Sequence, residues 1–156
     1  MTRRVEPVYR AAAGPLSTLH RACFPDDAWD VAAITGVMGI PGFFGRIAWE
    51  DEMPAGFALA LDLGKECELL SLGVVPARRR AGIGLALLDA VCCEVRRRGA
   101  DCIALEMAVD NGAARALYTA RGFTPVGRRR NYYRQRGRLV DALILRLALA
   151  TASLAT

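Results

Sequence analysis

Residues 74–84 read VVPARRRAGIG, an apolar stretch that Pro76 stops and that gives way to a helical pattern after Gly82. The residues before Pro76, from position 66 to 75, are mostly apolar and end in β-branched side chains, which is typical of a buried strand. Beyond Gly82, apolar residues recur at helical spacing as far as Val95. The stretch therefore predicts a strand, a glycine turn and a helix.

Other elements are expected on both sides of this unit. Further strands are predicted over residues 5–10, 43–50, 56–63, 102–109, 123–133 and 139–149, and further helices over residues 15–22, 26–38 and 111–121. Asp26 or Asp27 is placed to cap the helix over 26–38, and Asn111 to cap the last helix. Gly99 closes the helix that ends near Val95. The order of the elements implies a mixed sheet with helices packed on it.

Length and composition suit one domain over residues 1–156. Apolar residues make up 53% of the chain and charged residues 24%, as in globular proteins. No secretory signal is visible, and the apolar tail over residues 142–150 is interrupted by Arg146 and is too short to span a bilayer. The five cysteines form no C-x-x-C pair, so no metal is expected and free buried thiols fit a reducing compartment. We expect a cytoplasmic protein that makes no membrane contact.

The net charge of +5 raises the question of a nucleic-acid partner, because cationic side chains neutralise phosphates. Arginines cluster at residues 78–80, 96–98 and 128–138. These runs lie at the ends of predicted elements, where solvated charges are ordinary. Nucleic-acid binding is therefore not expected as the main function.

The glycine turn has the features of an anion-binding site. Gly82 and Gly84 lie where a strand gives way to a helix, and the first amides of a helix have no internal partner and attract phosphates. A G-x-G pattern alone is a weak signal and is more often explained by a plain tight turn. The full G-x-G-x-x-G of a dinucleotide site is missing, and no G-K-[ST] follows for a Walker A loop.

A second motif joins the first. From Asn111 to Phe123 the chain reads N-x-x-A-x-x-L-Y-x-x-x-G-F, downstream of the R-R-x-G-x-G at residues 79–84. Together they resemble the GNAT family of N-acetyltransferases. Glu106, twelve positions before Tyr118, together with RRNYY at residues 129–133 and DA at 141–142, resembles the RimI type, which acetylates the N-terminal alanine of a ribosomal protein. The resemblance covers about residues 67–145.

The resemblance implies a fold, a donor and a set of roles. The fold is a mixed, mostly antiparallel sheet of about six to seven strands flanked by about four helices, and the donor is acetyl-CoA. Glu106 would be the general base, through water, and Tyr118 the general acid. Asn111 would contact the cofactor from the start of its helix. The remaining cofactor contacts would come from the strand and turn, namely Leu72, Gly73, Val74, Arg79, Arg80, Ala81, Gly82, Ile83 and Gly84.

Elementary acid–base chemistry is consistent with these roles. An α-amine has a pKa near ~8, so roughly a tenth is neutral at pH 7, whereas a lysine amine near ~10.4 is almost fully protonated. A thiolate with a pKa of about 8.5 can take a proton from a phenol near ~10. Structural alternatives stay open: Glu106 as a hydrogen-bonded carboxylate within the sheet, and Tyr118 as a packing residue. His20, the sole histidine, is expected at the surface or half-buried. Of Tyr132 and Tyr133, one is expected to pack and the other to line the acceptor groove.

Three functions follow. The first is acetylation of a protein N-terminus, such as that of a ribosomal protein. The second is acetylation of a small-molecule amine or a protein lysine. The third, from another class, is a non-catalytic acetyl-CoA-binding or RNA-binding module. The presence of both Glu106 and Tyr118 favours an enzyme over the third.

Overall fold

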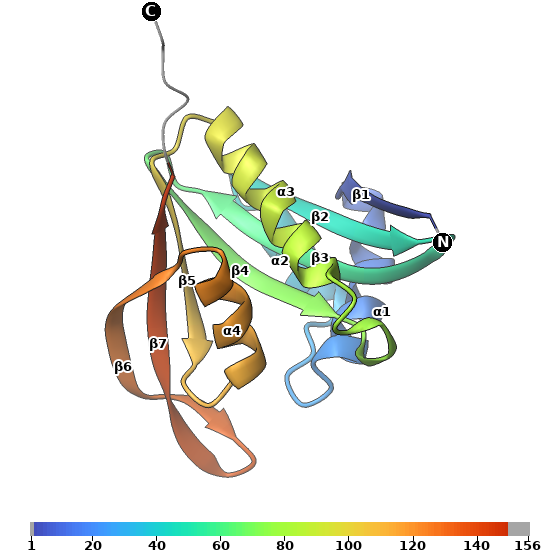
Figure 1. Ribbon diagram of the computed structural model, residues 1–156. Coiled ribbons are helices and arrows are strands. Elements are labelled where there is room, and N and C mark those ends of the chain that lie inside the picture. Colours follow the sequence, from blue (N-terminus) through green and yellow to red (C-terminus); the bar gives the residue numbers. More distant parts are fainter. Residues whose placement is uncertain (1, 150–156) are drawn as a thin grey trace, which may run out of the picture.

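The computed structural model describes residues 2–149, so Met1 and residues 150–156 lie outside it, together with the ends of the single-domain assignment and of the apolar tail. Figure 1 shows one twisted sheet with a long helix, α3, crossing it. The strands are β1 Arg3–Pro7, β2 Phe43–Glu50, β3 Met53–Asp62, β4 Glu66–Val74, β5 Cys102–Ala108, β6 Thr124–Gln135 and β7 Arg138–Ala148. The helices are α1 Ala13–Cys23, α2 Val31–Met38, α3 Ile83–Arg97 and α4 Gly112–Ala120, with 3₁₀ turns η1 Arg10–Ala12 and η2 Pro76–Arg78.

Within residues 2–149 the sheet has seven strands in the order β1-β2-β3-β4-β5-β7-β6, and the only parallel pair among them is β4 with β5. This confirms the mixed, mostly antiparallel sheet, in which the strands predicted over residues 43–50 and 56–63 pair as a hairpin. The parallel pair arises because α3 carries the chain from the end of β4 back to the start of β5, which is the crossover expected of a strand–helix–strand unit.

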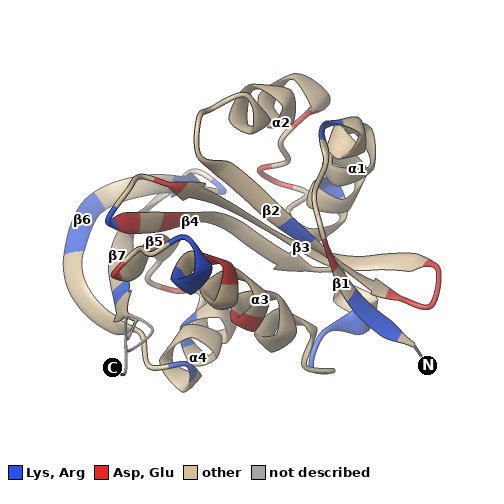
Figure 2. Ribbon diagram, turned by 90° about the horizontal axis from the view of Figure 1, so that it is seen from above, with Lys and Arg blue, Asp and Glu red and all other residues tan. Residues whose placement is uncertain are grey.

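Helices cover both faces of the sheet (Figure 2), with α1 and α2 on one side and α3 and α4 on the other. On the α3 side, Leu87, Leu88 and Val91 are fully buried, in the core that also contains Tyr118. A second core joins Leu16 of α1 to Phe57 of β3. No helix within residues 2–149 is long and apolar enough to cross a membrane.

The structure corrects several of the predicted element bounds; β3, for example, begins at Met53 rather than at residue 56. Helix α2 begins at Val31, and its N-cap is Asp30, whose carboxylate accepts from the Ala33 N–H at 2.8 Å, so Asp26 and Asp27 are not the cap. Residues 24–30 instead form a loop whose course is fixed by contacts with α1 rather than by local pattern. The first strand spans Arg3–Pro7 because it pairs with β2 only that far before η1 begins. The prediction for Asn111 is confirmed, since its side chain accepts from the Ala114 N–H at 3.1 Å.

Strands β4 and β5 separate part-way along their length. Their pairing runs from Glu66 opposite Cys102 to Leu69 opposite Leu105 and stops there, although both strands continue. A bulge in the β3–β4 register falls at Leu70, immediately after the last pair, and bends β4 away. The diverging ends are visible in Figure 1. The gap between them positions the site described below.

A buried carboxylate in α3 provides a test of stability. Glu94 is 7% exposed and its oxygens lie 2.6 Å from Arg97 Nε, 3.2 Å from Arg98 Nε and 3.5 Å from Arg46 Nη2. Hydrogen bonds from Arg97 outweigh burial and hold the pKa of Glu94 at about 2. Because the folded-state pKa is depressed, this stabilisation is present above the ordinary pKa of ~4.3 and is lost as the pH falls toward 2.

We therefore expect Glu94→Gln to lower the free energy of unfolding by about 2 kcal/mol at pH 7, with the deficit shrinking below pH ~4. Urea unfolding at pH 7 and pH 3 measures it. Asp89→Asn, which removes an ion pair to Arg121 on the exposed side of the same helix, is the matched control and should change stability by less than about 0.5 kcal/mol. A deficit that is the same at pH 7 and pH 3 would contradict the charge-based account.

Candidate active site

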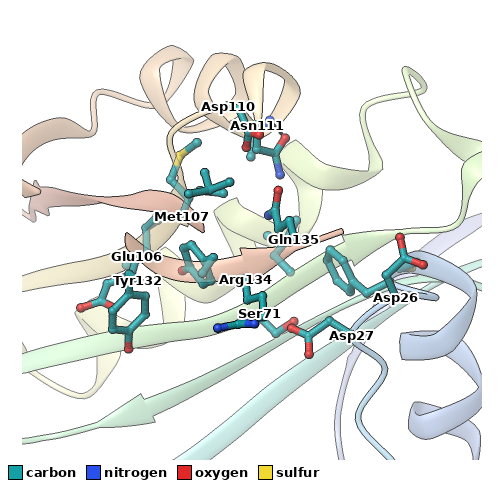
Figure 3. Close-up of a pocket in the computed structure, with 18 of the residues that line it drawn as sticks. Asp26, Asp27, Ser71, Glu106, Met107, Asp110, Asn111, Tyr132, Arg134 and Gln135 are labelled. Atoms are coloured by element: carbon teal, nitrogen blue, oxygen red, sulfur yellow. Dashed lines mark hydrogen bonds between the residues drawn. The ribbon is translucent and has the colours of Figure 1, made fainter. Parts of the chain in front are cut away.

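A cavity of about 970 Å³ opens where β4 and β5 part. Residues 69–72 of β4 and 105–108 of β5 form two of its walls, so the cavity occupies the gap that the lost pairing creates. The α1–α2 loop, the start of α4 and the β6–β7 hairpin complete it. Figure 3 shows Glu106, Asn111 and Asp26 around it, contributed by three different segments of the chain.

Glu106 lies on β5 with its side chain away from the α3 core. The alternation of the strand buries Leu105 and Met107 in that core and turns Glu106 to the opposite face. Its side chain is 23% exposed, and its Oε1 accepts a hydrogen bond from Arg129 Nε of β6 at 2.8 Å. The carboxylate is thus held in place by an arginine that sequence reasoning did not link to it.

Tyr118 reaches the same cavity from α4. It is 6% exposed, and its ring meets that of Phe123 edge-on at 5.5 Å between centroids. Burial raises the pKa of Tyr118 well above its ordinary value, so the phenol keeps its proton throughout the neutral and moderately alkaline range. The structure therefore brings Glu106, Tyr118, Leu72 and Asn111, predicted together from the sequence, onto the wall of one cavity.

The turn before α3 leaves its amides open. Gly82 has φ +82° and forms the N-cap of α3 without a side-chain cap, and Arg80 has φ +64°. Among the described residues, the N–H groups of residues 81–85 have no backbone partner. The Ala81 carbonyl is occupied, because it accepts from Arg3 Nη2 at 2.8 Å. Open N–H groups at the positive end of a helix dipole are what an anion requires.

The other predicted cofactor residues take several positions. Gly73 and Val74 are on β4 beyond the cavity wall, and the buried Ile83 side chain belongs to the α3 core. Arg79 donates from Nε to the Val74 carbonyl at 3.0 Å and from Nη2 to the Cys23 carbonyl at 3.4 Å, so its guanidinium links α1 to β4.

Packing explains one of two glycines among these residues and does not explain the other. A Cβ at Gly73 would lie 2.9 Å from Cys23 Cβ and from Phe57 Cε1, so packing of α1 against the sheet explains that glycine. Gly84, by contrast, has room for a Cβ, which would meet Leu117 of α4 at 3.4 Å.

Two tyrosines of β6 contribute to the cavity. Tyr132 is 54% exposed and Tyr133 is half-buried, and their rings meet edge-on at 5.0 Å. Both line the cavity, so the expectation that only one of them does so is wrong. The reason is a bulge between Arg129 and Tyr133, in which Asn131 has φ +52° and donates its N–H to Asp141 Oδ1 at 2.8 Å. Burial raises the pKa of Tyr133 to about 12, with Glu106 adding to the effect.

A second hollow of about 260 Å³ lies on the other side of Glu106. Glu66, Glu68 and Arg129 line it with Glu106. Burial raises the pKa of Glu68, and the nearby charges of Glu106 and Glu66 raise it further. Within residues 2–149 no group of three or more potential ligand side chains is arranged to hold a metal ion. In the sequence, period-two alternation along β4 and β5 was the only signal that Glu66, Glu68 and Glu106 share one face of the sheet.

His20 is where the sequence-based expectation fails. The residue is 3% exposed rather than at the surface or half-buried, and it lines the cavity. The helix pattern of α1 could not show this, because aromatic residues outside the helix cover the imidazole. Burial lowers the pKa of His20, despite an opposing effect of Asp27.

Comparison with known proteins places this geometry in a family. The model of the acetyltransferase (GNAT) family matches residues 14–123, which include β4, the α3 turn, Glu106 and Tyr118. The chain belongs to the GNAT family. This is the family that the motifs at residues 79–84 and 111–123 predicted.

Relatives of this GNAT domain include N-terminal acetyltransferases. It is 36% identical to the N-alpha-acetyltransferase RimI of Mycobacterium tuberculosis, over 94% of this chain and 96% of that protein. It is also 36% identical, over 96 residues, to an Escherichia coli alanine N-acetyltransferase of ribosomal protein bS18. That match covers 62% of this chain and 65% of the relative's length. The crystal structure of the Escherichia coli ribosomal-protein-alanine N-acetyltransferase shares the fold, with a TM-score of 0.90, 24% identity and 99% of each chain covered.

Proposed function

We propose that this protein transfers the acetyl group of acetyl-CoA to the α-amine of a protein N-terminus. The observation that carries the proposal is the cavity between the parted ends of β4 and β5, with a carboxylate on one wall and a buried phenol on another. Family membership supports acetyl transfer, and relatives over much of the chain are N-terminal acetyltransferases.

The backbone of β4 supplies the donors that a thioester needs. The Val75 N–H donates to the Ala55 carbonyl of β3 at 2.9 Å. Because successive N–H groups of a strand point to opposite neighbours, the Val74 N–H points into the gap that β5 has vacated. In our proposal it binds the carbonyl oxygen of the acetyl group and stabilises the oxyanion of the tetrahedral intermediate.

Proton transfer falls to Glu106 and Tyr118. Glu106 takes a proton from the attacking amine, through a water molecule, and Tyr118 donates one to the departing CoA thiolate. The bond formed is the new amide C–N, and the bond broken is the thioester C–S. Asn111 and the amides of Arg80 to Gly84 hold the cofactor, with the open N–H groups before α3 on its pyrophosphate.

The acceptor follows from the relatives and from acid–base chemistry. An α-amine is partly neutral at pH 7, whereas a lysine amine is almost fully protonated and must lose a proton before it can attack. A ribosomal protein with N-terminal alanine is the acceptor we propose to test first, because relatives act on one. A cytoplasmic location is part of this proposal, since ribosomal proteins are made there.

The proposal is tested by following thiol release from acetyl-CoA with a panel of acceptors. The panel contains a basic peptide that begins with alanine, the same peptide with a blocked N-terminus and an internal lysine, and small amines. We expect turnover with the free α-amine and none with the blocked peptide. Turnover with lysine or small amines alone would keep the acetyltransferase and discard the N-terminal acceptor.

The pyrophosphate site gives a prediction with an internal control. Gly82 and Gly99 lie at opposite ends of α3 with φ +82° and +81°, and a Cβ added at either position would meet no backbone atom within 4 Å. Alanine at either position costs about 1 kcal/mol of stability through the same left-handed strain. Only Gly82→Ala should raise the KM for acetyl-CoA, by about tenfold, because it shifts the open amides. Equal KM values for the two variants would remove the turn from the cofactor site.

A further inference from the structure

A buried histidine joins the α1–α2 loop to strand β4 beside the cavity. The His20 ring stacks on Trp29 of the loop, with 4.8 Å between centroids and 17° between planes. It meets Phe57 of β3 at 5.3 Å. The proton transfers at Glu106 and Tyr118 make no use of this residue, although it lines the same cavity.

Its hydrogen bonds fix where its proton lies. The Trp29 N–H donates to His20 Nδ1 at 3.1 Å, so this nitrogen carries a lone pair. Burial lowers the pKa of the imidazole, which keeps the ring neutral at pH 7. A neutral ring with an unprotonated Nδ1 carries its hydrogen on Nε2. Nε2 therefore donates to Ser71 Oγ, 3.4 Å away.

The hydrogen bond from His20 determines what the Ser71 hydroxyl can do. Because Oγ accepts from His20, its own O–H remains free to donate, and Ser71 forms no other side-chain hydrogen bond among the described residues. The residue is half-buried on the cavity wall, one position before Leu72. Figure 3 shows Ser71 lying between Glu106 and Asp27 in that view, toward the side of the cavity that the α1–α2 loop borders.

The same histidine fixes the loop. Both backbone groups of Trp29 form hydrogen bonds to side chains of α1. Its N–H donates to His20 Nδ1, and its carbonyl accepts from Ser17 Oγ at 3.0 Å. Asp26 and Asp27, which precede Trp29, line the cavity opposite β5. The shape of this wall and the orientation of Ser71 thus depend on one imidazole.

We propose that Ser71 donates a hydrogen bond to the carbonyl group adjacent to the acceptor's amine, and that His20 is the residue that positions it. Every peptide N-terminus has a carbonyl two bonds from its α-amine nitrogen, whereas a simple alkyl amine and a lysine side chain have none there. The pair therefore selects α-amino carbonyl compounds among amines. This inference rests on the proposed function and specifies how that site recognises its acceptor.

Two matched substrates and one variant test it. Alaninamide carries the carbonyl and isopropylamine lacks it, while both present an amine on a carbon that bears a methyl group. We expect Ser71→Ala to raise the KM for the alanine peptide and for alaninamide by about 3- to 10-fold, the effect of one lost hydrogen bond. Its KM for acetyl-CoA and its kcat/KM for isopropylamine should match those of the wild type.

Variants of His20 separate positioning from packing. His20→Phe keeps an aromatic ring on Trp29 but removes both hydrogen bonds, and His20→Gln keeps an amide N–H that can donate to Ser71. Thermal unfolding is recorded for both, because Phe leaves the buried Trp29 N–H without a partner. We expect His20→Phe to raise the KM for the peptide at least as much as Ser71→Ala, and His20→Gln to recover part of it. If His20 has only a structural role, the two variants should shift Tm but should not differ in their KM for the peptide in this way.

The two possible failures are distinguishable. If wild-type protein acetylates the peptide and Ser71→Ala leaves the KM for peptide and alaninamide unchanged, the role of Ser71 is overturned. If the wild type acetylates only lysine or isopropylamine and not the peptide or alaninamide, the proposed N-terminal function is overturned, and the recognition of an adjacent carbonyl with it.

Discussion

Glu106→Gln is expected to lower kcat by about 10²- to 10³-fold while the Kd for acetyl-CoA stays within about twofold of the wild-type value. A general base contributes about 10²–10⁴-fold to a proton-transfer step, and glutamine cannot accept the proton. The side chain lies on β5 and is not part of the turn whose open amides precede α3, so cofactor affinity should be retained. Single-turnover rates measure the loss, and calorimetric titration measures acetyl-CoA binding.

The control for this variant is on the same face of the sheet. Glu66→Gln removes a carboxylate that lies 3.9 Å from Arg146 and lines the smaller hollow, outside the main cavity. It should leave kcat within about twofold, because exposed ion pairs contribute little. Glutamine at position 106 keeps the shape and an oxygen for Arg129. Parallel loss of turnover and of acetyl-CoA binding would show instead that Glu106 is a structural carboxylate.

Tyr118→Phe is expected to lower kcat by about 10²-fold with the fold intact. Phenylalanine keeps the ring and its edge-on contact with Phe123, and removes only the hydroxyl that would protonate the departing thiolate. Thermal unfolding checks that the core of α4 is preserved. An unchanged kcat would leave Tyr118 as a packing residue, the alternative that its helical spacing also allows.

The pH dependence adds a second measurement for Tyr118. A phenol with its ordinary pKa of ~10 would be half ionised at pH 10 and would lose its function as a donor. Burial raises the pKa of Tyr118, so the proton remains in place at that pH. We expect the ratio of wild-type kcat to that of Tyr118→Phe to stay constant from pH 7 to pH 10. A ratio that falls toward one over this range would show that the phenol ionises in the active enzyme.

Much of the fold could be predicted from local sequence. Strands β2, β4 and β5 and helix α3 lie within one or two residues of their expected bounds, because period-two and helical patterns over half-buried elements are strong signals. The start of α2 could not be predicted, since three aspartates, Asp26, Asp27 and Asp30, each suit an N-cap. Packing of Trp29 against α1 decided among them.

The residues of the candidate site were likewise predicted from the sequence only in part. Glu106, Tyr118, Leu72 and Asn111 were assigned through the resemblance to the GNAT family, and they do line one cavity. Arg129, His20 and Ser71 were not assigned to it, because their connections span 23 and 51 positions and no local pattern reports such distances. The bulge that places both Tyr132 and Tyr133 at the cavity depends on Asp141 of the next strand.

Residue type and short-range spacing were enough to predict the family, the strand–turn–helix at residues 66–97 and the candidate acid–base pair, because each of these is carried by a local pattern. Three other features emerge only in the folded chain: β4 and β5 part after Leu69 and Leu105, Arg129 holds Glu106, and His20 is buried with its proton on the side of Ser71. The physical reason is that a strand's pairing partner, an ion pair across a sheet and the burial of a ring are set by segments far apart in the chain, which meet only on folding.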